Sequence, residues 1–271
     1  MKIGPEAFRE FERAGWEAIP KEYHHAFGNL TTQTIGPLLD AVRVASGTKF
    51  LDIATGPGYV AAAAAKRGAT VLGIDFSIAM ITQARDLYPG IDFREGDAEK
   101  LPLGNALFDA AVMNFGILHV SRPDLALLEV WRVLRAGGQF AFTAWAEPEY
   151  TIGFGIVLRA VEAYGEASIE LPKGPPFFHF GNPAESVKAL LAAGFESPSV
   201  VKVPQVWRLP PGDALFHVME TSTVRTAGLL RSQKPAVLEK IREAMRAETE
   251  QYRKGNVIEL PMPALIASAT K

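Results

Sequence analysis

The stretch that decides the fold of this chain is Leu51-Asp52-Ile53-Ala54-Thr55-Gly56-Pro57-Gly58-Tyr59-Val60-Ala61, which joins an apolar run to a helical pattern. Glycines at such a turn let the backbone approach a ligand closely, and the following helix offers unpaired N–H groups. Gly56-x-Gly58-x-x-Ala61 also satisfies the dinucleotide pattern, although by itself it equally fits a tight strand-to-helix turn. The turn is longer than a pyrophosphate turn requires, and Asp52 lies within reach of a cationic amino acid. Both details favour a ligand other than a dinucleotide.

Short apolar runs alternate with helical patterns on both sides of this turn, from residue 49 to about residue 145. This alternation is typical of a parallel α/β sheet covered by helices on both faces. Strands are predicted over 50–53, 70–74, 92–95, 108–113 and 139–145. Helices are predicted over 60–67, over 125–134 and after Ser77, which is placed to cap the helix that carries Met80.

The alternation of short apolar runs and helical patterns ends after Trp145. A segment rich in proline and phenylalanine reaches residue 180, and a helix is predicted over 183–193. A sixth strand is predicted over 200–209, where Pro204 indicates an edge or a bulge, and a last strand over 257–269. Between them, an apolar stripe lies among charged residues at Leu238, Ile241, Met245 and Tyr252.

The composition limits the class of protein. The 271 residues include 28 Lys plus Arg and 30 Asp plus Glu, and 48% are hydrophobic, so the chain can bury a full-sized core. The formal net charge of −2 excludes the broad positive surface of a dedicated nucleic-acid-binding protein. No cysteine is present, which excludes disulfides and thiolate chemistry. Because Glu6, Glu10 and Glu12 stand where a signal peptide would be apolar, we expect a cytoplasmic protein with no membrane segment.

Five motifs, in order along the chain, resemble those of the class I S-adenosylmethionine-dependent methyltransferases. Within that family the chain is most similar to the branch that includes the ubiquinone/menaquinone biosynthesis methyltransferases, over about residues 31–145. Residues 51–58 match the family's Asp-x-Gly-x-Gly-x-Gly loop, with Ala54 in place of the first glycine. The other motifs are GIDFS from residue 73 followed by Met80, GDAEKLP from 96, FDAAV from 108 and RVLRAGG from 132.

The resemblance implies an α/β, Rossmann-like seven-stranded methyltransferase sheet with helices on both faces and a partly helical substrate cap. It also implies S-adenosylmethionine as the cofactor. Asp75 would accept hydrogen bonds from ribose hydroxyls, Phe76 and Met80 would sandwich adenine, and Asp97 with the Ala98 N–H would contact its edge. The implied cofactor-binding residues are Tyr23, Asp52, Ala54, Gly56, Gly58, Asp75, Phe76, Met80, Asp97, Ala98, Glu99, Asn114 and Phe115.

Local alternatives stay open for several of these residues. Asp75 could stabilise the start of the next helix, Met80 could pack in the core, and residues 97–99 could form a capped turn. The implied domain division places an N-terminal lid segment and the cofactor-binding core in residues 1–145. Residues 146–271 would then hold the remaining sheet elements, at about 183–209 and 257–269, with inserted cap segments.

A catalytic base is needed only if the acceptor is protonated when it binds. His119 follows the fourth strand at the end of the sheet where ligands bind, so it is the candidate base, with a structural role as the alternative. His179 and His217 in the cap are weaker candidates, and His24 with His25 would be exposed or packed. The histidines show no metal-ligand spacing, so no metal is expected.

The acceptor is expected to be a small molecule rather than nucleic acid, since Met113-Asn114-Phe115-Gly116 is not an Asn-Pro-Pro-aromatic motif. Phe177-Phe178-His179-Phe180 could form a lid or acceptor wall, or a loop plugged into the core. The stripe at 238–252 indicates cap packing or a homodimer surface. Two other functions remain open: a nicotinamide-dependent oxidoreductase, and a non-catalytic protein that binds S-adenosylmethionine on the same fold.

Overall fold

The computed structural model describes residues 4–166 and 171–271. Its main sheet has seven strands in the order β3-β2-β1-β4-β5-β10-β6. In chain order they are β1 (Lys49–Ile53), β2 (Thr70–Asp75), β3 (Asp92–Glu95), β4 (Phe108–Met113), β5 (Leu134–Trp145), β6 (Glu196–Val203) and β10 (Ala264–Thr270). Strands β1 to β5 pair in parallel, and β10 is antiparallel to both β5 and β6. The expected seven-stranded Rossmann-like sheet is therefore confirmed.

Helices cover both faces of this sheet, because alternate strand residues point to opposite sides. Phe50 and Val112 pack in one cluster with Leu38 of α3 (Ile35–Ala41) and Val60 of α4 (Tyr59–Lys66). On the same side, α5 (Ile78–Leu87) packs against α4 and β3. The other face packs against α6 (Pro123–Val133) and α8 (Pro183–Ala192). The predicted cap of α5 is present, since Ser77 Oγ accepts a hydrogen bond from Met80 N at 3.2 Å.

Two expected strands are each broken in two. The strand predicted over 200–209 is split into β6 and β7 (Val206–Leu209), and the one predicted over 257–269 into β9 (Val257–Pro261) and β10. A proline interrupts each of them, Pro204 and Pro263, because proline cannot donate to the ladder. Met262 N donates to Gln205 O at 2.9 Å between the two halves. The same two chain segments thus leave the main sheet and continue into a second sheet, ordered β7-β9-β8, with β8 at Arg253–Lys254.

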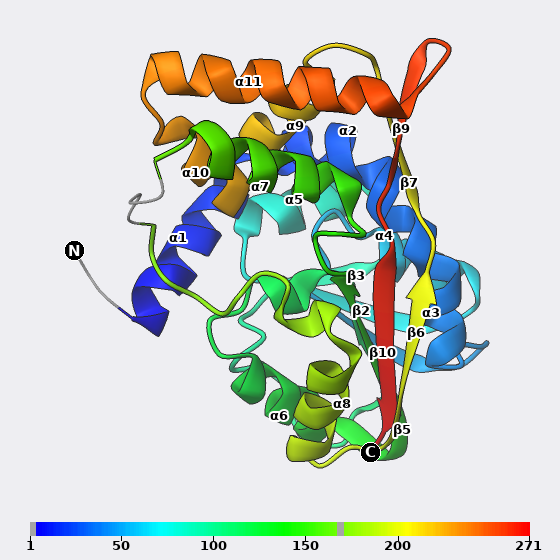
Figure 1. Cartoon of the computed structure of the whole chain (residues 1–271). Coiled ribbons are helices and arrows are strands. Elements are labelled where there is room, and N and C mark those ends of the chain that lie inside the picture. Colours follow the sequence, from blue (N-terminus) through cyan, green and yellow to red (C-terminus); the bar gives the residue numbers. More distant parts are fainter. Residues whose placement is uncertain (1–3, 167–170) are drawn as a thin grey trace.

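The remaining helices gather at one end of the main sheet. Figure 1 shows β10 running from this end to the C-terminus at the opposite end, so the parallel strands finish beneath the helices. These helices are α1 (Pro5–Ala18), α2 (Pro20–Thr31), α7 (Ile152–Tyr164), α9 (Ala214–Thr221), α10 (Arg225–Arg231) and α11 (Pro235–Thr249). Ile241 and Met245 of α11 are buried, and α11 packs on α7 and α9. The apolar stripe of α11 is therefore used for packing within the cap.

In the parts of the chain that the structure describes, no helix combines the length and apolarity needed to span a membrane.

Candidate functional site

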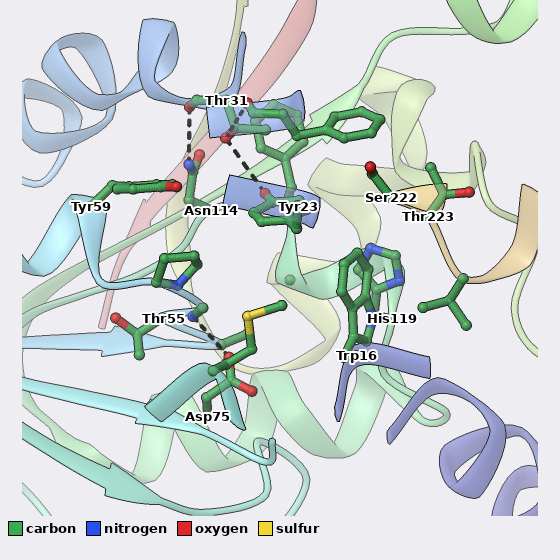
Figure 2. Close-up of a pocket in the computed structure, with 18 of the residues that line it drawn as sticks. Trp16, Tyr23, Thr31, Thr55, Tyr59, Asp75, Asn114, His119, Ser222 and Thr223 are labelled. Atoms are coloured by element: carbon green, nitrogen blue, oxygen red, sulfur yellow. Dashed lines mark hydrogen bonds between the residues drawn. The ribbon is translucent and has the colours of Figure 1, made fainter. Parts of the chain in front are cut away.

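A pocket lies where β1, β2, β4 and β5 end beneath the helices (Figure 2). Its floor is the turn between β1 and α4. Gly58 takes a left-handed backbone conformation with φ at +83°, and a Cβ there would lie 2.7 Å from Phe93 Cζ, so only glycine fits. Ala54, which stands at the family's first glycine, also has a positive φ of 52°. This conformation is strained for alanine but leaves the backbone facing the pocket.

Asp52 lines this pocket with an incompletely satisfied carboxylate. Its Oδ2 accepts hydrogen bonds from Thr55 Oγ1 at 2.6 Å and from Ala61 N at 3.0 Å. Its buried Oδ1 has no hydrogen-bond partner among the described residues. Burial raises the pKa of Asp52 to about 7, because the charged form loses its hydration, although the two hydrogen bonds oppose the shift. A cationic group of a ligand would satisfy this oxygen.

Asp75 lies at the end of β2, beside Phe76 and Met80, which line the same pocket. Its Oδ2 accepts from Gly56 N at 2.8 Å and its Oδ1 from Ser77 N at 2.9 Å. Burial raises the pKa of Asp75 to about 6, against the effect of these two donors. Each oxygen keeps a further lone pair for a ligand hydroxyl. Asp75 therefore orders the glycine turn and is also placed for ligand binding.

A second, smaller recess opens from the pocket and shares Ala54, Phe76 and His119 with it. Asp97 and Ala98 line this recess, as the resemblance implied for the adenine edge. Glu99 also lies there, but protein donors occupy its carboxylate. The donors are Ser121 N and Oγ at 2.7 Å each, Arg122 N at 3.0 Å, and the guanidinium of Arg9 in α1. Glu99 thus ties α1 to the loop after β4, and its role as a cofactor contact stays a prediction.

Asn114 and Phe115 line the pocket where β4 ends. Asn114 Oδ1 accepts from Thr34 Oγ1 at 2.9 Å and Thr143 Oγ1 at 2.8 Å, and its Nδ2 donates to Thr31 O at 3.2 Å. Its amide is therefore committed to holding the end of α2 against the sheet. Tyr23 of α2 faces the same space (Figure 2). Burial raises the pKa of its hydroxyl.

His119 contacts Glu12 and Trp16, two residues of α1. Its Nδ1 lies 2.9 Å from Oε2 of Glu12 in α1, a fully buried side chain, and Trp16 Nε1 donates to the same oxygen at 3.0 Å. Arg225 Nε, at the start of α10, donates to Glu12 Oε1 at 2.7 Å. Burial opposes ionisation of Glu12, but His119 and then Arg225 together hold its pKa below the ordinary value. Figure 2 shows the His119 ring beside Trp16, facing the pocket.

Aromatic side chains form much of the remaining wall. Phe115 stacks on Trp145 with ring centroids 4.1 Å apart, and Phe154 of α7 continues the row to Phe177 at 5.3 Å. The phenylalanine-rich loop, residues 172–180, therefore contributes Phe177 to the pocket. Phe178 packs behind it against Phe154. The aromatic residues that line the pocket are Trp16, Tyr23, Phe27, Tyr59, Phe76, Phe115, Trp145, Phe154 and Phe177.

The other histidines lie outside this pocket. His179 lines an outer groove and its Nε2 is 3.7 Å from Glu185, while His217 is exposed on α9. His24 Nδ1 is 2.5 Å from the Tyr59 hydroxyl, and His25 is exposed. Among residues 4–166 and 171–271, no three metal-ligating side chains gather into a cluster.

Sequence reasoning missed Glu12, Trp16, Phe154 and Arg225. A signal for Glu12 exists, because it stands four residues after Phe8 and four before Trp16, so a carboxylate interrupts an aromatic stripe on one face of a helix. A charge within a buried stripe indicates a partner elsewhere. No local signal identifies Arg225 as that partner.

Comparison with known proteins finds a family model, curated relatives and solved structures similar to this chain. Residues 51–142 match a family model described as a methyltransferase domain. The chain is 32% identical over 156 residues to the demethylmenaquinone methyltransferase of Renibacterium salmoninarum, covering 56% of this chain and 64% of that protein. It is 42% identical over 104 residues to the ubiquinone/menaquinone biosynthesis C-methyltransferase of Bartonella bacilliformis, covering 35% and 40% respectively. The chain thus spans less than two thirds of the length of these curated relatives.

Among solved structures, a phosphoethanolamine-type N-methyltransferase of Haemonchus contortus, in complex with phosphomonomethylethanolamine and S-adenosylhomocysteine, superimposes with a TM-score of 0.60. The match covers 98% of this chain and 61% of that one at 18% identity, so it concerns the fold alone. Together these findings confirm the resemblance that the five motifs indicated.

Proposed function

Because residues 51–142 carry a methyltransferase domain, we propose that this protein transfers a methyl group from S-adenosylmethionine to a small-molecule acceptor. The observation that carries the proposal is the pocket formed where β1 and β2 end, with Asp52 and Asp75 facing it and a recess beside Asp97. A sulfonium supplies an activated methyl group that a bound nucleophile can displace in line, so positioning provides much of the acceleration. The relatives named above support an acceptor of low molecular mass.

The residues fit this cofactor at several points. The unpartnered Oδ1 of Asp52 is suited to the cofactor's ammonium group, and Asp75 to its ribose hydroxyls. Phe76 and Met80 would hold the adenine ring, and Asp97 with the Ala98 N–H would bind its edge in the smaller recess. Ala54, Gly56 and Gly58 would bring the backbone close to the methionine part, and Tyr23, Asn114 and Phe115 would enclose it.

In this proposal the two parts of the chain bind different molecules. Residues 1–145 bind the cofactor, and residues 146–271 supply acceptor contacts from Phe154, Phe177 and the Ser222–Thr226 turn, all of which line the pocket. A homodimer, a cytoplasmic location and the lack of nucleic-acid binding remain predictions of the sequence. Light scattering, cell fractionation and a gel-shift assay test them in turn.

Calorimetric titration with S-adenosylmethionine, S-adenosylhomocysteine and NAD tests the proposal directly. We expect both sulfur-containing ligands to bind, and NAD to give no signal. Tight binding of NAD with no response to S-adenosylmethionine would instead establish the oxidoreductase alternative. Formation of S-adenosylhomocysteine in the presence of small acceptors then separates an enzyme from a protein that only binds the cofactor.

Asp75→Ala should weaken the binding of S-adenosylmethionine by about 1.5–3 kcal/mol, the range for a hydrogen bond to a charged group. Asp86→Ala is the matched control, since Asp86 is exposed on α5. Because Asp75 also accepts from Gly56 N and Ser77 N, thermal unfolding of the ligand-free variant must be followed in parallel. Unchanged affinity in a folded Asp75→Ala protein contradicts the proposed site.

A further inference from the structure

The contact between Glu12 and His119 determines which imidazole nitrogen carries a proton. The Glu12 carboxylate also accepts hydrogen bonds from Arg225 Nε and Trp16 Nε1, so we infer that His119 Nδ1 donates to it across 2.9 Å. In the neutral ring, Nε2 then keeps its lone pair. Nε2 makes no hydrogen bond within the described chain and is not buried, and His119 lines both the pocket and the recess.

Glu12 is in turn fixed by Arg225, whose three guanidinium nitrogens all donate to protein acceptors. Its Nε donates to Glu12 Oε1, its Nη1 to Pro175 O at 2.8 Å and its Nη2 to Leu118 O at 2.5 Å. These contacts join α1, α10, the phenylalanine-rich loop and the loop after β4. The carboxylate is therefore held rigidly behind the imidazole.

We propose that His119 is a general base, with Glu12 as its positioning residue, and that the acceptor is a neutral, flat molecule carrying an acidic hydroxyl on its ring. This inference rests on the proposed methyl transfer. The hydroxyl proton passes to His119 Nε2, and the oxygen lone pair forms the new bond to the methyl carbon. The carbon–sulfur bond breaks with its electron pair left on sulfur, and the imidazolium afterwards returns its proton to solvent.

The charged side chains that line the pocket limit which acceptors can bind there. Of the described side chains that line it, the charged ones are Asp52, Asp75 and Arg225, together with the titratable His119. Arg225 is already paired with Glu12, so none of these side chains offers a free cation to a phosphate or a carboxylate. Aromatic walls favour a planar ring through offset or edge-to-face contacts. A ring hydroxyl combines this shape with a proton that a histidine can remove near neutral pH.

Several ionisable groups face His119 and contribute to the expected pH dependence. Glu12 from α1 and, from further away, Asp75 at the end of β2 carry carboxylates, and Arg225 from α10 carries a guanidinium paired with Glu12. The groups around the adjoining recess pair with one another: Arg9, Asp97 and Glu99. Replacing Glu12 by glutamine should therefore destabilise the imidazolium and weaken the base.

The test follows the ionisation of a bound phenol, which needs no turnover. 4-Nitrophenol is added to protein saturated with S-adenosylhomocysteine at about pH 6, and the yellow phenolate band is measured against free probe. We expect the bound probe to be more ionised than the free one. Glu12→Gln and His119→Gln should lower the bound phenolate-to-phenol ratio on the order of tenfold, equivalent to about one pH unit. Glu10→Gln and His217→Gln, at exposed positions on α1 and α9, should not.

Glu12→Asp keeps the charge and should restore part of the ionisation that Glu12→Gln loses, which a purely structural role would not require. Calorimetry with S-adenosylhomocysteine checks that each variant keeps the cofactor site. If the parent protein does not bind S-adenosylhomocysteine, the proposed function itself fails. If it does but 4-nitrophenol stays neutral, does not bind, or ionises equally in the Glu12 and His119 variants, only the present inference is overturned. Preferential binding of phosphoethanolamine overturns the neutral acceptor.

Discussion

The Asp52→Asn substitution should make the ligand-free protein more stable at alkaline pH and weaken its binding of S-adenosylmethionine. Asp52 is buried with one unpartnered oxygen, and its pKa is raised from 3.8 to about 7. As pH rises, the unfolded chain ionises first, so this carboxyl lowers the stability of the folded state progressively between about pH 4 and 7. At about 1.36 kcal/mol for each pKa unit, the full loss is at most about 4 kcal/mol.

The amide that this substitution introduces would place an unpartnered N–H where Oδ1 of Asp52 now lies, which costs about 1–3 kcal/mol at every pH. Because this cost is the same at every pH, the informative quantity is the change with pH in the difference between the unfolding free energies of the two proteins. Linkage predicts that the stability of Asp52→Asn relative to the parent rises by about 2–3 kcal/mol between about pH 5 and about pH 8. The net effect should be a more stable variant at the higher pH.

Urea denaturation of both proteins at the two pH values, without ligand, measures this difference. Ionisable groups common to both proteins cancel in the comparison. Calorimetry at about pH 8 should show S-adenosylmethionine binding weakened by about 1.5–3 kcal/mol, since the ammonium group loses its charged partner. A stability difference that does not change with pH would refute the reasoning about Asp52, and unchanged binding would refute its proposed contact with the cofactor.

The remaining predictions concern packing, the acceptor wall and the N-terminal helix. A Cβ on Gly116 would lie 2.5 Å from Ala54 Cβ, so Gly116→Ala should destabilise the protein by about 1–3 kcal/mol, and adding Ala54→Gly should recover part of the loss in urea denaturation. Phe177→Ala should lower methyl transfer with little change in cofactor affinity by calorimetry, whereas His179→Ala, outside the pocket, should change neither. Arg9→Gln removes the donor that holds α1 to a buried carboxylate, so stopped-flow measurements should show faster release of S-adenosylhomocysteine; an unaltered rate would contradict a closing role for α1.

The sequence by itself determined the part of the protein that we propose binds the cofactor. The turn at 51–61, the cap at Ser77 and the acidic residues at strand ends were all predicted and are present, because each depends on residues within a few positions. Parallel strands then bring Asp52 and Asp75 to one edge without further information, as their register pairs Asp52 with Gly73. Sequence also marked Pro204 as an irregular point, although it did not show that the strand would divide between two sheets.

Only the tertiary structure decided the side of the pocket that we propose binds the acceptor. His119 lies 107 residues from Glu12 along the chain, and Arg225 lies 213 residues from it, so no local pattern relates the three. Their meeting depends on how α1 and α10 pack over the ends of the strands, which is set by the burial of whole helix faces rather than by turn or capping rules. The same packing brings Phe177 to the pocket and leaves Phe178 and His179 behind it, a choice between neighbouring residues that composition cannot make. Local hydrogen bonding shaped the proposed cofactor site, and long-range packing of apolar surfaces shaped the rest of the pocket.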